Sequence, residues 1–239
     1  SCRVIPNRGS WLDFEFDVKD LLYFKIDRKK KILASTLLLA LGFSKADMVD
    51  EFYDSEEYSY DTKVEKWKTK FNPENYKAKN FSEEVVDAKT GKIVIKLGDK
   101  INYLNAKKFS NDGLKNILVS KESLYGKFLH SDVKINNDED GVLKIGTELN
   151  ETVIQQILDA NIHSLEISVT NSINKGGYLL TTIFNDKNNT KDEAITEIYK
   201  MLRPGEPPTI EIATQIFNNL FFSSDRYDLS DVGRVKMNS

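Results

Sequence analysis

The stretch that decides the fold is Trp11-Leu-Asp-Phe-Glu-Phe-Asp-Val-Lys-Asp-Leu-Leu-Tyr-Phe-Lys-Ile-Asp27. Apolar and polar residues alternate on both sides of its centre, which predicts two strands of a β-hairpin. Strands whose apolar faces match need an odd number of residues between them, so we expect a three-residue loop at 18–20. The cross-strand pairs then expected are Leu12–Ile26, Asp13–Lys25, Phe14–Phe24, Phe16–Leu22 and Trp11–Asp27.

A basic run, Arg28-Lys29-Lys30-Lys31, directly follows this hairpin. Four consecutive charges usually form a solvated face, and that interpretation stays open. Trp11, at the end of the neighbouring strand, favours a second interpretation, in which the run belongs to a nucleic-acid contact. An exposed aromatic ring can stack on an unpaired base, Asp27 can accept hydrogen bonds from it, and the cations can attract the phosphate backbone.

The composition limits the classes of function. With 34 basic and 37 acidic residues and a net charge of −3, the chain is not a generally basic nucleic-acid binder, so any such contact needs a local patch. Cys2 is the one cysteine, and the sequence has neither a signal peptide nor an apolar run that could span a membrane, which favours the cytoplasm. Because the chain starts without Met, we expect a piece of a longer polypeptide.

Arginine is confined to the two ends of the chain, at positions 3, 8, 28, 203, 226 and 234. Since the planar guanidinium makes paired hydrogen bonds that lysine cannot make, the ends are predicted to carry recognition surfaces. Codon bias in an AT-rich genome is the alternative explanation for the arginine-free middle.

Capping patterns predict several helices in the end segments. Gly42 should end a helix over 36–41, and Ser44-Lys-Ala-Asp47 should begin the next one. Residues 190–193 form a capping box for a helix that must stop at Arg203 before Pro204, and Pro207-Pro208-Thr209 should start another. Residues 54–81 show weak periodicity and are interpreted as a connector or an irregular entry into another module.

The middle of the chain contains an internal repeat. Residues 98–120 align without gaps on residues 146–168, and both read turn, helix, helix end, strand. Asn102 matches Asn150 at the helix start, and Gly113 matches Asn161 where a left-handed residue is expected. The pattern predicts a compact α+β subdomain built on a duplicated unit, with an accidental match as the alternative.

No catalytic constellation is found. His130 and His163 lack partners at metal-ligand spacing, and Cys2 lies near the chain end, so structural or surface roles are expected for all three. We therefore predict no catalytic residue, no metal ligand and no cofactor in this chain.

Four separated motifs closely resemble the lobe region of the bacterial RNA polymerase β subunit. They are Arg8-Gly-Ser-Trp-Leu-Asp-Phe-Glu-Phe-Asp17, Lys25-Ile-Asp-Arg28, Arg203-Pro-Gly-Glu-Pro-Pro208 and Phe221-Phe-Ser-Ser-Asp-Arg-Tyr-Asp-Leu-Ser-Asp-Val-Gly-Arg234. The middle of the chain more loosely resembles the insertion that proteobacterial β subunits carry inside the lobe. The resemblance implies a nucleotidyltransferase assembled from β, β′, an α dimer and ω, with σ added for promoter recognition.

The resemblance also implies roles for individual residues. Trp11 would stack on a base of the non-template strand, Asp27 would lie in or beside the same pocket, and Arg8 and Arg28 would support that pocket or face phosphates of the downstream DNA. The catalytic Mg²⁺ would be held by β′, so this segment would be inactive by itself. Lys29 and Lys30 stand where the family commonly has arginines, which keeps the charge but loses bidentate contacts.

The predicted fold class is α+β. A discontinuous mixed helix/strand lobe, residues 1–53 and 185–239, would be interrupted by a smaller α+β insertion domain, residues 54–184. The lobe would form one wall of the downstream DNA cleft, with Arg8, Trp11, Asp27, Arg28, Lys29, Lys30 and Lys31 as its nucleic-acid-binding residues, and the insertion would dock transcription regulators. Two alternatives are a protein-docking scaffold with negligible DNA contact and a free-standing single-strand-binding protein.

Overall fold

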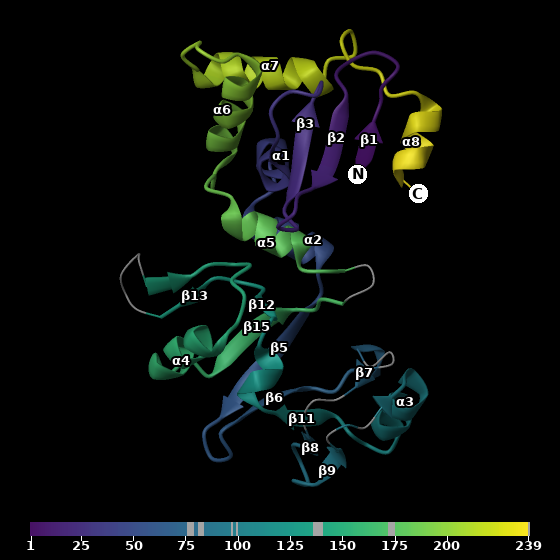
Figure 1. Cartoon of the computed structure of the whole chain (residues 1–239), viewed down its shortest axis with the longest axis vertical. Coiled ribbons are helices and arrows are strands. Elements are labelled where there is room, and N and C mark those ends of the chain that lie inside the picture. The colour runs from purple at the N-terminus through teal and green to yellow at the C-terminus, as the bar shows by residue number, and fades with distance from the viewer. Residues whose placement is uncertain are drawn as a thin grey trace. The chain divides into compact units, whose positions relative to one another are not determined.

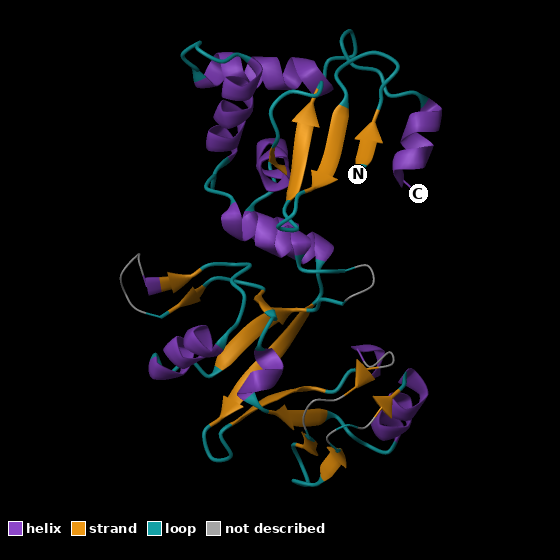
Figure 2. Cartoon of the chain, viewed as in Figure 1, coloured by secondary structure: helices purple, strands orange, loops and turns teal. Residues whose placement is uncertain are grey.

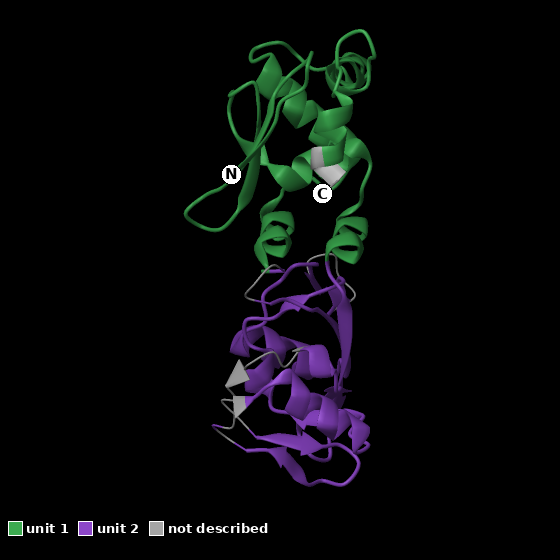
Figure 3. Ribbon diagram, turned by 90° about the vertical axis from the view of Figure 1, so that its right-hand side faces the viewer, with its two compact units in different colours: residues 1–52, 176–239 green, residues 53–175 purple. Residues whose placement is uncertain are grey.

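The computed structural model describes residues 1–75, 79–80, 84–96, 98, 100–135, 141–171 and 175–238. It divides into two compact units (Figure 3). Unit 1 comprises residues 1–52 and 176–239, and unit 2 comprises residues 53–175. The first boundary differs by one residue from the predicted one. The second lies at 175/176 rather than 184/185, and unit 2 is not the smaller of the two.

Unit 1 contains a four-stranded antiparallel sheet in the order β1-β2-β3-β4. The strands are β1 (Cys2–Val4), β2 (Leu12–Phe16), β3 (Leu22–Ile26) and β4 (Ile32–Leu33), and Figure 1 shows β1, β2 and β3 side by side. The predicted hairpin register is confirmed, from Leu12 opposite Ile26 to Phe16 opposite Leu22. Its loop is also the predicted one, because the Asp17 amide donates to the Leu21 carbonyl at 3.1 Å and Asp20 takes the left-handed conformation at φ 59°.

Helices of unit 1 lie around this sheet, some packed on its strands and others on one another (Figure 2). They are α1 (Ala34–Leu41), α2 (Lys45–Phe52), α5 (Tyr178–Asn185), α6 (Lys191–Leu202), α7 (Ile210–Phe221) and α8 (Asp231–Asn238). The predicted ends are confirmed: Gly42 is left-handed after α1, the box of Thr190 and Glu193 begins α6, and Thr209 caps α7. At the start of α2, the amide and hydroxyl of Ser44 donate to Asp47 and lower its pKa.

Helix α5 explains why the second boundary moves. It packs on α1 and β3 of unit 1, and its residues Leu179, Leu180 and Ile183 are buried. The Leu22 amide also donates to the Thr182 hydroxyl at 2.9 Å. The sequence-based boundary followed a change of composition after residue 184, whereas the buried apolar face of α5 ties the helix to unit 1.

Unit 2 is built on a seven-stranded sheet among the described residues, in the order β12-β15-β5-β6-β11-β8-β9. The connector predicted for residues 54–81 is wrong over its first part, because residues 55–70 form the central hairpin, with Tyr58 and Trp67 buried in the core. Phe81, the last residue of that prediction, lies outside the described residues. The strands of the sheet are β5 (Ser55–Asp61), β6 (Lys66–Lys70), β8 (Val85–Asp87), β9 (Ile93–Ile95), β11 (Asn116–Val119), β12 (Phe128–Leu129) and β15 (Ser164–Ser168).

The remaining elements of unit 2 are two short strand pairs, two α-helices and two 3₁₀ turns within the described ranges. They are β7 (Lys79–Asn80) with β10 (Lys100–Ile101), β13 (Val133–Lys134) with β14 (Val142–Leu143), α3 (Tyr103–Asn111), α4 (Glu151–Asp159), η1 (Pro73–Asn75) and η2 (Lys121–Leu124).

The two segments that the repeat aligned have the same local structure. Asn102 caps α3 and Asn150 caps α4, each side chain accepting a backbone hydrogen bond at 2.9 Å. Gly113 and Asn161 take the left-handed conformation after the helices, at φ 101° and 57°. The following strands β11 and β15 pair with β6 and β5, the two strands of the central hairpin. An origin by duplication stays a prediction, and Asp99 of the first copy lies outside the described residues.

Candidate nucleic-acid interface

Trp11 lies at the end of the unit 1 hairpin, held against Asp27 by the backbone. The Trp11 amide donates to the Asp27 carboxylate at 2.8 Å, and the Asp27 amide donates to the Trp11 carbonyl at 3.0 Å. The predicted placement of these two residues opposite each other is therefore confirmed. One Asp27 carboxylate oxygen accepts from the Trp11 amide, while the residue itself remains exposed.

Asp27 and Arg28 form a tight turn after β3 with an unusual backbone. Their φ values are 48° and 60°, and the Lys29 amide closes the turn on the Ile26 carbonyl at 2.9 Å. Consecutive non-glycine residues in the left-handed region cost energy and are concentrated at functional sites. The turn directs Arg28 to the Trp11 ring, with its guanidinium carbon 5.5 Å from the ring centroid.

Arg3 is a second cation at the same ring, and the sequence did not single it out. Its guanidinium carbon lies 5.6 Å from the Trp11 centroid, and its Nε donates to the carboxylate of Asp13. Both guanidinium groups lie within the range of cation–π attraction. We call Arg3, Trp11, Asp13 and Arg28 the Trp11 cluster. The sequence does contain one signal for this cluster: Trp11 and Asp13 are two residues apart, so their side chains share one side of an extended strand.

An open cleft of about 550 Å³ adjoins the Trp11 cluster. Both of its carboxylates have partners, because Asp13 pairs with Arg3 and Glu15 pairs with Lys25 at 2.7 Å. Arg28 has no carboxylate partner among the described residues, so its guanidinium charge is not neutralised within the cleft. Its lining residues are Ser1, Cys2, Arg3, Asp13, Phe14, Glu15, Lys25 and Arg28. Although Asp13 stands opposite Lys25 as predicted, its ion pair is with Arg3.

The lysines of the basic run have different environments. The Lys29 ammonium donates to the Leu202 carbonyl at the end of α6, at 3.2 Å. The Lys31 ammonium lies 4.1 Å from the centroid of the Tyr23 ring, and burial together with the Asp17 carboxylate raises the pKa of that tyrosine. Lys30 is exposed and makes no hydrogen bond, ion pair or cation–π contact with the part of the chain that the structure describes. Of these lysines, Lys30 is the one most available to a phosphate.

Arg8 is hydrogen-bonded to the C-terminal segment of unit 1. Its guanidinium donates to the Ser224 carbonyl at 2.9 Å, and its backbone pairs with Asp228 through bonds of 3.4 and 2.7 Å. The structure therefore joins two of the quoted motifs at this point. It does not bring the Arg8 side chain to the Trp11 ring, where Arg3 and Arg28 lie instead.

The histidines have structural environments in unit 2. His130 is buried, and its Nδ1 hydrogen-bonds to the Ser168 hydroxyl at 3.0 Å. His163 stacks on Tyr60 with ring centroids 6.1 Å apart. Within the described ranges, no three His, Cys, Asp or Glu side chains gather in a way that could hold a metal ion. No helix among the same residues is long and apolar enough to cross a membrane.

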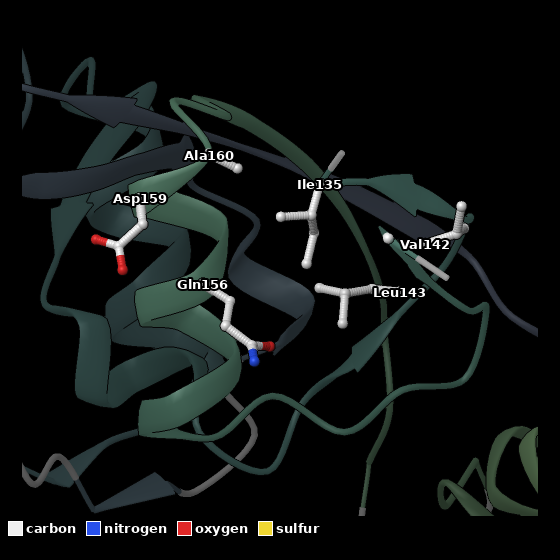
Figure 4. A pocket seen from close by; sticks show the side chains of 7 residues that line it. Ile135, Val142, Leu143, Gln156, Asp159 and Ala160 are labelled. Atoms are coloured by element: carbon white, nitrogen blue, oxygen red, sulfur yellow. The ribbon is translucent and has the colours of Figure 1, made fainter. Parts of the chain in front are cut away.

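A second pocket of about 420 Å³ lies in unit 2, between the β13–β14 hairpin and α4 (Figure 4). The side chains of Ile135 and Leu143 face Gln156, whereas Asp159 points away from the opening. Gly141, Val142 and Ala160 complete its lining. The described lining supplies one carboxylate and no nucleophile or cation, so this pocket has no evident catalytic chemistry.

Comparisons with known proteins agree with the motifs. A family model described as RNA polymerase Rpb2, domain 2, matches residues 157–239. Over 239 residues, all of this chain, the sequence is 44% identical to the DNA-directed RNA polymerase subunit β of Rickettsia prowazekii (strain Madrid E) and 45% identical to that of Rickettsia conorii. The chain spans 17% of the length of each of these relatives. The resemblance that the motifs predicted is therefore confirmed: from end to end, the chain is a relative of one segment of the bacterial RNA polymerase β subunit.

Proposed function

We propose that this chain acts as part of the β subunit of a DNA-directed RNA polymerase in the bacterial cytoplasm. Unit 1 would be the lobe that forms one wall of the downstream DNA cleft and helps hold the non-template strand. The observation that carries this proposal is the Trp11 ring beside two guanidinium groups at a left-handed turn. Base–aromatic stacking contributes about 1–3 kcal/mol, and neighbouring cations add attraction for the backbone.

The other steps of RNA synthesis would be carried out by other parts of the polymerase. Binding of NTPs, the catalytic Mg²⁺ and bond formation would belong to the assembled enzyme, with β′, the α dimer, ω and σ as partners. Within this chain, Trp11 would receive the base, Asp27 would accept from its edge, and Arg28 and Lys30 would attract phosphates. This segment would have no nucleotidyltransferase activity by itself.

Replacement of Trp11 in the assembled polymerase tests the assignment. Trp11→Ala should shorten the lifetime of the open promoter complex roughly 5- to 150-fold, as expected from losing about 1–3 kcal/mol of stacking. Trp11→Phe keeps an aromatic ring and should retain most of the lifetime. An open complex that decays equally fast with Trp11→Ala and with the wild-type residue would refute the role of Trp11.

The basic run is tested by the salt dependence of promoter binding. Neutralising Lys29, Lys30 and Lys31 together should flatten the dependence of affinity on salt, because each phosphate contact contributes about one unit of slope. An unchanged slope would identify the run as a solvated face.

Unit 2 supports a second candidate function, that of a docking surface for other proteins. It has its own buried core, and the chain enters and leaves it side by side: the Val169 amide donates to the Asp54 carbonyl at 2.8 Å, and Lys175 pairs with Asp54 at 3.3 Å. Replacing residues 53–175 by a short Gly-Ser linker should therefore leave unit 1 folded. Retained basal transcription with loss of a regulator's effect would favour docking, whereas loss of basal transcription would argue against it.

A further inference from the structure

Arg3 occupies a fixed position beside Trp11. It lies on β1 directly opposite Asp13 of β2, and its Nε donates to the Asp13 carboxylate. Asp13 is only 8% exposed. A carboxylate this buried needs its cation, because an unpaired charge in such a place is strongly destabilising. The strand ladder and the ion pair together therefore determine where the Arg3 guanidinium lies.

Arg28 is held much less firmly at the same ring. It is exposed, it lies on a turn, and no carboxylate among the described residues pairs with it. The two guanidinium groups lie at nearly the same distance from the Trp11 centroid, 5.6 and 5.5 Å. They differ in their partners: Arg28 could turn to a phosphate without breaking an ion pair of the described residues, whereas Arg3 would have to leave Asp13.

We infer that Arg3 is a positioning residue for the non-template strand. Fixed on Asp13, it holds the Trp11 indole in the orientation that receives a base, while Arg28 is left to bind the adjoining phosphate. The inference deepens the proposed function and rests on it, since it assigns a task to a residue that would act only through Trp11.

A double-mutant cycle in the assembled polymerase tests the coupling. Arg3→Lys keeps the charge for Asp13 but loses the planar guanidinium, and it should shorten the open-complex lifetime roughly two- to fivefold, the effect of one exposed cation–π contact. In a Trp11→Ala background the same change should have no effect. An equal effect in both backgrounds would overturn the inference, because Arg3 would then act independently of Trp11.

Two further variants keep the result interpretable. Arg3→Gln combined with Asp13→Asn replaces the ion pair by a neutral hydrogen bond and should show the same loss and the same dependence on Trp11. Arg203→Lys is the matched control, since Arg203 also forms an ion pair, with Glu206, but lies over no aromatic ring of the described residues. A loss with Arg203→Lys as large as that with Arg3→Lys would also overturn the inference.

Fluorine NMR separates this inference from the proposed function. The chain has two tryptophans, so 5-fluorotryptophan labelling gives one signal for Trp11 and one for Trp67. Arg3→Lys should move the Trp11 signal and leave the Trp67 signal in place. If Trp11→Ala does not affect the open complex, the proposed function fails, whereas an unmoved Trp11 signal shows that Arg3 does not hold the indole.

Discussion

Replacing Asp186 by alanine should destabilise unit 1 and leave unit 2 unchanged. Asp186 is 5% exposed and lies directly after α5. Its carboxyl group accepts hydrogen bonds from the hydroxyls of Ser35 and Thr36 in the first turn of α1, and from the amide of Asn188 at 2.9 Å. It therefore ties the segment before unit 2 to the segment after it.

The magnitude follows from the hydroxyl groups that would be left without an acceptor. Ser35 and Thr36 are 0% and 1% exposed, so water cannot replace Asp186. An unsatisfied buried donor costs about 1–3 kcal/mol, so the two hydroxyls give about 2–6 kcal/mol for Asp186→Ala. Asp186→Asn keeps one acceptor oxygen and should cost about 1–2 kcal/mol. With a urea m-value of about 2 kcal/mol/M, the alanine variant should lower the midpoint of unit 1 by roughly 1–3 M.

Urea unfolding of the 239-residue chain can follow each unit separately, because Trp11 lies in unit 1 and Trp67 in unit 2. Fluorescence should be recorded in Trp67→Phe and Trp11→Phe backgrounds. Asp225→Asn, at an exposed position, is the control and should move neither midpoint. A unit 1 midpoint within 0.3 M (about 0.6 kcal/mol) of the wild-type value, or an equal shift in both units, would refute the reasoning.

Three further predictions concern unit 1. Lys29→Met should lower the free energy of unfolding by about 0.5–1 kcal/mol because α6 loses a cation at its C-terminus, whereas Lys30→Met should leave it unchanged; equal urea midpoints for the two variants would contradict their different environments. Gly9→Ala should cost at least about 2 kcal/mol, since Gly9 has φ 127° and an added Cβ would lie 2.5 Å from the Tyr227 ring; thermal unfolding checks this, and a wild-type melting temperature would count against it. Backbone amides of Asn189 and Thr190 lower the pKa of Glu193 below 4.5. The contribution of Glu193 to the stability of unit 1 is therefore present above that pH and is lost as the pH falls through the folded-state pKa. Glu193→Gln should flatten the change in unit 1 stability between pH 7 and pH 3, and an unaltered pH profile would rule this out.

Local signals predicted the features that depend on near neighbours in the chain. The alternation on both sides of residues 18–20 gave the correct hairpin register, since a shift by one residue would turn the apolar face outward. The ends of α1, α2, α6 and α7 followed from caps whose donors and acceptors lie within a few residues of each other. Trp11 and Asp27 were placed correctly because the hairpin register carries them together.

Other features depend on contacts between distant segments and had no local signal. The alternation of β2 predicts an exposed side for Asp13, yet β1 covers it and Arg3 neutralises it. In the sequence, Lys29 is one of four similar cations; only the structure shows that its ammonium donates to a carbonyl at the end of α6. The hairpin at residues 55–70 was missed because its strands lie inside the sheet, paired with β11 and β15, and their burial in the core does not follow from their own pattern.

The sequence by itself determined the hairpin, the helix caps and the resemblance to the β subunit. Register and capping depend on residues close together in the chain, and the motifs can be recognised from their residues and their order alone. Only the tertiary structure decided that α5 belongs with unit 1, that Asp186 joins the two segments flanking unit 2, and that Arg3 rather than Arg8 lies at the Trp11 ring. The physical reason is the same in each case. Burial of an apolar face or a charged group is favourable only where another segment covers or pairs it, and that segment lies far away in the chain.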